Sequence, residues 1–335
     1  MPFVKDIENY KSLAIVGLEK NTGKTECLNY VLSQLKNGTK KIALTSIGVD
    51  GESVDQVTHK HKPEIEIYEG MLFVTPELLY KKRKLVAEVL EISTQTTALG
   101  RLITARAQTS GKVILSGPTT TKSLKELIVK MQDYGADLTI IDGALSRKSS
   151  GSPTVTEAMI LTTGATVSGN IPQLVFKTEY VFNLINIEKV EEVLVDKLME
   201  IESGVWAINP FGEVIDLKIN SVLNSEKIKE NLFNFGTRFY VGGAITDSFI
   251  EFLKNQKLGT EIEIIVRDFT KIFVSPEMYY SFLKRGGKVS VLQKTKLIAI
   301  CINPTSPEGY NLNSDELKEA LELKLLLPVY DVKKL

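Results

Sequence analysis

The chain has 335 residues, 43% hydrophobic and 24% charged, a composition typical of a globular protein with room for two domains. Lysine plus arginine (41) balance aspartate plus glutamate (41), so no overall charge favours nucleic acid or an anionic membrane as a partner. No apolar run approaches the roughly 18 residues of a membrane span. There is also no signal-peptide pattern, and Cys27 and Cys301 are the only cysteines, so we expect a cytoplasmic protein with reduced thiols.

An apolar strand that runs into a glycine-bounded loop stands near the start of the chain. The strand covers residues 13–17, the loop ends in Gly23-Lys24-Thr25, and a helical pattern follows to about residue 35. Backbone N–H groups of such a loop, with the positive end of the next helix, surround a phosphate. The pattern predicts that Lys24 contacts the terminal phosphates of a nucleotide and that Thr25 offers its hydroxyl to Mg²⁺. The alternative is an ordinary turn between a strand and a helix.

The spacing of this loop is longer than the common one. Gly17 and Gly23 enclose five residues instead of four, which resembles the loop of dethiobiotin-synthetase-like ATPases. Lys20 lies four residues before Lys24, whereas the signature lysine of the ParA and nitrogenase-iron-protein group lies five before, so that role is not assigned to Lys20. The residues expected to contact the nucleotide are Gly17, Asn21, Thr22, Gly23, Lys24, Thr25 and Glu26.

A second strand, residues 41–45, is followed by a polar segment that contains Asp50-Gly51. Ligands of open α/β sheets bind where parallel strands end, so Asp50 is a candidate to hold Mg²⁺ through water or to orient an attacking water. The alternative is an Asp-Gly turn without chemistry. His59 and His61 follow on a basic stretch, where a solvated surface pair is favoured over a metal site.

Further elements are expected before the next candidate site. Residues 64–68 and 70–75 predict a hairpin, residues 78–90 and 98–107 predict helices, and residues 113–116 predict a strand. Between the two helices, Ser93–Thr97 is rich in hydroxyl groups, which indicates a solvated loop or one that faces a ligand.

The apolar strand 138–142 ends in Asp142. A carboxylate at the end of such a strand can bind Mg²⁺ across from Thr25, so Lys24, Asp50 and Asp142 form the predicted catalytic set, and Thr25, Asp50 and Asp142 the predicted metal set. Arg147 and Lys148 follow, where they either close over phosphates or belong to a solvated loop.

The second half of the chain predicts a smaller α/β domain. A helix at 156–161 and a strand at 165–171 are expected to complete the first domain. An acidic helix at 188–202 is expected to mark the boundary with the second. We therefore expect a nucleotide-binding domain at 1–187, with the parallel sheet of a P-loop NTPase and helices on both faces, and a C-terminal α/β domain at 188–335.

Several of these motifs together carry a resemblance to a known family. They are residues 20–26, residues 46–52, Asp142–Arg147 and residues 154–165. The chain resembles the larger, ATP-binding subunit of the lysine 5,6-aminomutase reactivase. That resemblance implies ATP and Mg²⁺ as cofactors and a smaller reactivase subunit as a partner. It also implies a client, the adenosylcobalamin- and pyridoxal-phosphate-dependent lysine 5,6-aminomutase, in which damaged cobalamin is exchanged for intact coenzyme.

Two other functions remain open from the residues. The long loop is also similar to that of the dethiobiotin-synthetase-like and cobyrinate-amidase-like ligases, which phosphorylate a carboxylate in the same cleft. A regulator that binds a nucleotide without hydrolysing it is the other alternative. The chain has no Asn-Lys-x-Asp segment of the kind that recognises guanine, which favours ATP over GTP.

Overall fold

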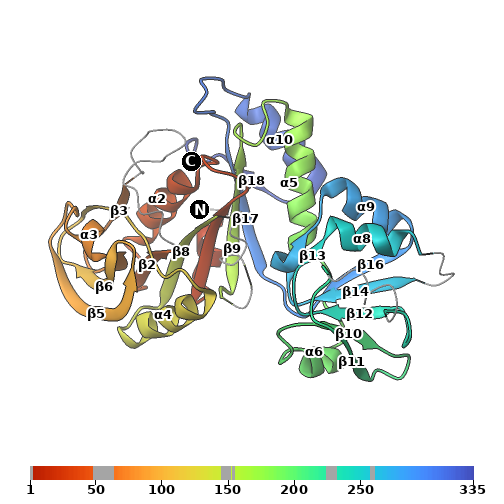
Figure 1. Ribbon diagram of the computed structural model, residues 1–335. Coiled ribbons are helices and arrows are strands. Elements are labelled where there is room, and N and C mark those ends of the chain that lie inside the picture. The colour runs from red at the N-terminus through yellow and green to blue at the C-terminus, as the bar shows by residue number, and fades with distance from the viewer. Residues whose placement is uncertain (1–2, 48–63, 145–151, 153–154, 224–231, 257–260) are drawn as a thin grey trace. The chain divides into compact units, whose positions relative to one another are not determined.

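The computed structural model describes residues 3–47, 64–144, 152, 155–223, 232–256 and 261–335 (Figure 1). It is a mixed α/β protein with a large, mostly parallel sheet, which confirms the predicted α/β class. The chain divides into two compact units: Met1–Thr178 with Thr295–Leu335, and Glu179–Lys294. Within the described residues, no helix combines the length and the apolar character that crossing a membrane requires.

This division differs from the expected boundary at residues 187 and 188. Residues 295–335 belong to the first unit, because β17 (Lys296–Asn303) pairs with β9 and β18 (Val329–Tyr330) pairs with β17. The pairing joins segments far apart in sequence, and no local pattern marks it. The first unit is therefore built from both ends of the chain.

Among the described residues, the sheet of the first unit has nine strands in the order β18-β17-β9-β1-β8-β2-β4-β6-β5. Neighbours from β18 to β4 are parallel, and β4, β6 and β5 are successively antiparallel. A separate pair, β3 (Ile65–Ile67) with β7 (Gly111–Val113), is antiparallel. The remaining strands of the large sheet are β1 (Ser12–Gly17), β2 (Ile42–Ser46), β4 (Leu72–Pro76), β5 (Ala87–Thr97), β6 (Gly100–Ala107), β8 (Leu138–Ala144) and β9 (Ala158–Gly164).

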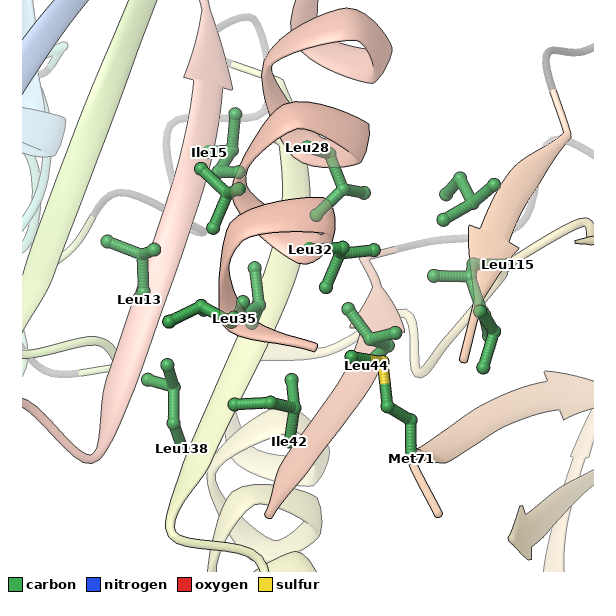
Figure 2. Close-up of a cluster of buried hydrophobic side chains, with 14 of the residues drawn as sticks. Leu13, Ile15, Leu28, Leu32, Leu35, Ile42, Leu44, Met71, Leu115 and Leu138 are labelled. Carbon is green, nitrogen blue, oxygen red and sulfur yellow. The ribbon is translucent and has the colours of Figure 1, made fainter. Parts of the chain in front are cut away.

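Helices pack on both faces of this sheet. Leu44 belongs to a core cluster with Leu28 and Leu32 of α2 (Lys24–Leu35), shown in Figure 2, whereas Ala43 packs with Met131 of α4 (Thr121–Asp133). Successive side chains of a strand point to opposite faces, so α2 and α4 cover opposite sides. The other helices that begin in this unit are α1 (Val4–Ile7), α3 (Glu77–Tyr80), α5 (Ile171–Ile185) and α10 (Ser314–Leu325).

The second unit has a five-stranded sheet in the order β11-β10-β12-β14-β16. Strands β12, β14 and β16 are parallel, and β10 is antiparallel to both of its neighbours. Its core includes Leu198, Tyr240 and Ile265. The elements are α6 (Glu192–Leu198), β10 (Val205–Ile208), β11 (Val214–Ile219), β12 (Arg238–Val241), β13 (Ile245–Thr246), α8 (Asp247–Lys254), β14 (Ile262–Val266), the 3₁₀ turn η3 (Phe269–Lys271), β15 (Ile272–Phe273), α9 (Pro276–Lys284) and β16 (Gly287–Val291).

The predicted helices at 78–90 and 98–107 are wrong. Residues 87–97 and 100–107 form the antiparallel strands β5 and β6. In the tight turn between them, the Thr97 hydroxyl donates to the Gly100 carbonyl (2.7 Å) and accepts from the Leu99 N–H (3.1 Å), and Gly100 has a positive φ of 96°. The β-branched side chains of β5 favour a strand, and the helical spacing of apolar residues misled the prediction because the ladder of β5 contains irregularities. The hydroxyl-rich segment 93–97 is part of β5, not a loop.

Five other element predictions also differ from the structure. The expected helix at 156–161 is strand β9, buried along its whole length, and the expected strand at 165–171 precedes helix α5. A short apolar run with both faces buried has no period that separates a strand from a helix. The expected hairpin is absent, because β3 pairs with β7 and β4 pairs with β2 and β6. The acidic helix is limited to α6, and the strand predicted at 113–116 ends at Val113.

Candidate functional site

The backbone between β1 and α2, residues 18–23, makes a tight loop that requires both predicted glycines. Gly23 caps α2 with a left-handed backbone (φ 89°), a conformation in which side chains are strained. At Gly17, a Cβ atom would lie 2.3 Å from the Thr22 hydroxyl, which is closer than van der Waals contact allows. The sequence pattern thus reflects the backbone geometry of this loop.

Strand β9 holds the loop from one side. The backbone N–H of Leu18 donates to the Thr162 carbonyl (2.9 Å), and the hydroxyls of Thr22 and Thr162 are 2.9 Å apart. Thr22 is buried and its hydroxyl lies 3.0 Å from the Glu19 carbonyl. The Thr22 side chain, predicted to contact a nucleotide, is therefore engaged inside the protein as a brace for the loop.

Strand β17 holds the loop from another direction. The Asn303 amide, at the end of β17, donates from Nδ2 to the Asn21 carbonyl (3.1 Å). Asn21 is one of the non-glycine residues with positive φ (60°) among the described residues. Asn303 was not among the site residues predicted from the sequence. The available signal was an apolar strand that ends in Asn303-Pro304, but that strand was assigned to the other domain.

The first turn of α2 carries the residues predicted to contact phosphate. The N-cap residue of this helix, Gly23, has no side chain to cap it, and the backbone hydrogen bonds begin with Cys27 N–H to the Gly23 carbonyl (2.9 Å). The first N–H groups of a helix and its positive dipole favour an anion. Glu26 is exposed and forms an ion pair with Lys333 (3.8 Å), so its carboxylate is directed to the C-terminal segment.

Lys24 and Asp142 lie within electrostatic reach of each other. Burial lowers the pKa of Lys24, while the Asp142 carboxylate raises it and the Lys20 charge lowers it further. Asp142 is placed by its strand, because β8 pairs with β1 at Ile15 and with β2 at Ser46. The structure therefore brings together the loop lysine and the strand-end carboxylate that the sequence predicted.

An oxygen donor set suitable for Mg²⁺ is present in part. The Thr25 hydroxyl and the Asp142 carboxylate are hard oxygen ligands, which Mg²⁺ prefers. In the part of the chain that the structure describes, no group of three His, Cys, Asp or Glu side chains gathers as a metal site. Thr25 and Asp142 supply oxygen ligands of the kind that suits an ion whose other ligands come from phosphate and water. Asp50, His59, His61, Arg147 and Lys148 lie outside the described residues.

The two cysteines, far apart in sequence, meet behind the loop. The buried thiols of Cys27 on α2 and Cys301 on β17 are 3.6 Å apart and are not joined as a disulfide. The hydrogen bond with Cys27, together with burial, raises the pKa of Cys301 well above its usual value. Cys301 is therefore held in the neutral form, and the two buried side chains act as small apolar groups that pack α2 against β17.

A small pocket opens beside the loop on the β17 side. Its lining residues are Thr22, Gly23, Glu26, Cys301, Ile302, Asn303, Val332 and Lys333.

Comparisons with models of known protein families, with curated proteins and with solved structures gave no match for this chain. The functional inference therefore depends on the geometry and chemistry of the site.

Proposed function

We propose that this protein binds Mg²⁺–ATP at residues 17–26 and hydrolyses it as a P-loop ATPase. The observation that carries the proposal is the placement of Lys24 beside Asp142 at the loop between β1 and α2. A lysine with lowered pKa and partly withdrawn from water, beside an uncapped helix start, suits a polyanion that supplies the missing negative charge.

Each site residue has a role in this proposal. Lys24 and the backbone N–H groups of the loop bind and orient the terminal phosphates, and their positive charge is fixed in place before the reaction. Thr25 and Asp142 would hold Mg²⁺, whose charge would offset that of the phosphates. Asp50 orients the attacking water. The absence of an Asn-Lys-x-Asp segment supports adenine as the base.

The physiological role that we propose is reactivation of adenosylcobalamin-dependent lysine 5,6-aminomutase, together with a smaller partner subunit. The support for this role is the sequence resemblance at the loop, at residues 46–52 and at Asp142–Arg147. ATP hydrolysis in the cytoplasm would drive a conformational change that lets damaged cobalamin leave the mutase.

The long spacing between Gly17 and Gly23 favours one competing function, a dethiobiotin-synthetase-like or cobyrinate-amidase-like ligase. The two functions differ in what turnover requires. A ligase needs a small carboxylic acid to accept the phosphoryl group, whereas the proposed ATPase releases phosphate from ATP and water alone. A nucleotide-binding regulator would bind ATP without phosphate release above background.

The deciding experiment is Mg²⁺–ATP titration by calorimetry, with phosphate release measured on the same preparation. Lys24→Ala should weaken binding or turnover at least tenfold, about 1.4 kcal/mol, because one positive charge on the phosphates is lost. Lys36→Ala is the matched control, since Lys36 follows the far end of α2 and contacts the Tyr68 ring. Equal affinity and equal hydrolysis in wild-type and folded Lys24→Ala protein would reject the site.

A further inference from the structure

Asn303 is fixed at both ends of its amide group. Its Oδ1 accepts a hydrogen bond from the backbone N–H of Thr305 (3.2 Å), and its Nδ2 donates to the carbonyl of Asn21 (3.1 Å). The Thr305 contact assigns oxygen and nitrogen, because only the oxygen can accept from an N–H. The side chain therefore presents a donor to the loop in a single orientation.

The contact is made at the part of the loop where the backbone is least favourable. Asn21 has a left-handed backbone (φ 60°), which costs free energy in a residue with a side chain. A Cβ atom on the left-handed Gly23 would lie 2.8 Å from the Asn303 Cβ, so Asn303 also packs closely on the next turn of the loop. One residue of β17 thus contacts the loop at both of its left-handed positions.

We infer that Asn303 is a positioning residue that holds loop 18–23 in the conformation that binds phosphate. Without its N–H donor, the Asn21 carbonyl is free to turn towards water, and the loop has to be ordered each time a polyphosphate binds. The ordering cost appears as weaker binding of any ligand that carries the phosphate chain. This inference rests on the proposed phosphate site and assigns to it a residue from the opposite end of the chain.

The test uses inorganic tripolyphosphate with Mg²⁺, because this probe contains the phosphate chain and no base. Asn303→Ala should weaken the binding of tripolyphosphate and the binding of ATP by a similar factor of about tenfold. It should change kcat for ATP hydrolysis less than KM. Asn303→Asp keeps the Thr305 contact but places a second acceptor against the Asn21 carbonyl. It should therefore weaken the binding of both ligands at least as much as Asn303→Ala does. Faster amide hydrogen exchange at residues 18–23 without ligand should accompany both changes.

Two control variants separate this role from general stability. Asn313→Ala removes a helix cap in the same C-terminal segment and should lower stability without changing tripolyphosphate affinity. Thr305→Ala keeps the backbone N–H that donates to Asn303, so it should change neither the stability of the protein nor its affinity for tripolyphosphate.

The outcomes are distinct for the two claims. Wild-type protein that binds neither ATP nor tripolyphosphate overturns the proposed function and this inference together. Wild-type binding that is unchanged in folded Asn303→Ala and Asn303→Asp overturns the inference alone. If the Asn303 variants lose affinity for ATP but keep their affinity for tripolyphosphate, the inference is also overturned, since Asn303 would then act on the base.

Discussion

At the scale of single residues, the site combines a lysine charge that burial destabilises with a loop backbone in a conformation that is unfavourable by itself. Burial lowers the pKa of Lys24, and Asn21 and Gly23 have left-handed backbones. Such features lower the stability of a folded protein and persist when the surrounding structure fixes them, which is typical of binding sites. The loop that carries them is held by Thr162 on β9, which contacts Thr22, and by Asn303 on β17, which contacts Asn21.

The charge of Lys24 predicts a gain of stability on its removal. Because its pKa is lowered in the folded state from 10.5, the unfolded chain binds the Lys24 proton more tightly than the folded chain does. The protonated lysine therefore destabilises the folded state at pH 7, and this cost declines as the pH rises from the lowered pKa towards 10.5. Lys24→Met should raise the free energy of unfolding at pH 7 by about 1 kcal/mol.

The measurement is urea denaturation of ligand-free protein at several pH values. The difference between Lys24→Met and wild type should shrink at alkaline pH. A difference of the opposite sign at pH 7, or one that is independent of pH, would contradict a destabilising charge at this position.

The two carboxylates predict separate effects on the reaction. If Asp142 holds the metal, Asp142→Asn should raise the Mg²⁺ concentration for half-maximal hydrolysis about tenfold, which corresponds to about 1.4 kcal/mol of lost interaction. If Asp50 orients water, Asp50→Asn should leave ATP binding nearly intact and lower hydrolysis. Magnesium titration of phosphate release checks both, and an unchanged Mg²⁺ requirement in Asp142→Asn would remove that residue from the metal site.

At the scale of elements, local patterns predicted the parts of the site that are contiguous in sequence. The strand, loop and helix at residues 12–35 and the strand that ends near Asp142 are where the sequence placed them. Strand β9 was mistaken for a helix because an apolar run buried on both faces carries no period. Asn303 was missed because its contact with Asn21 depends on the pairing of β17 with β9, which no window of sequence contains.

Helix α10 provides a prediction at this scale. Its N-cap, Asn313, accepts hydrogen bonds from the backbone N–H groups of Asp315 (3.0 Å) and Glu316 (3.3 Å). Asn313→Ala leaves these donors without their partner and should lower the free energy of unfolding by about 1 kcal/mol. Chemical denaturation measures this change, with the nearby exposed Asn311→Ala as a control close to zero. Equal losses for the two variants would show that the cap is not the source of the effect.

At the scale of the whole molecule, the chain leaves the first unit within α5 and returns at Thr295. The returning segment is β17, which starts at Lys296 and ends at Asn303, where it contacts loop 18–23. The same strand thus connects the second unit along the chain with a residue that holds the loop. Asn303 and the second unit are therefore joined through the chain by β17.

The proposed reactivase role predicts that nucleotide state alters the affinity of this protein for the aminomutase. A machine that exchanges cobalamin has to bind the inactivated mutase and then release it, so ATP and ADP should change its affinity for the mutase by a coupling free energy of about 1–3 kcal/mol. Neither His59 nor His61 stands in the Asp-x-His-x-x-Gly context of base-off cobalamin domains, so we expect the smaller subunit to contribute to binding of the mutase.

Lysine 5,6-aminomutase inactivated with a cobalamin analogue should recover activity when this protein, its partner subunit, ATP, Mg²⁺ and fresh adenosylcobalamin are added. Lys24→Ala should abolish the recovery, because the exchange needs the bound phosphates. A preparation that binds and hydrolyses ATP, yet gives no ATP-dependent recovery, would reject the reactivase role and favour the ligase.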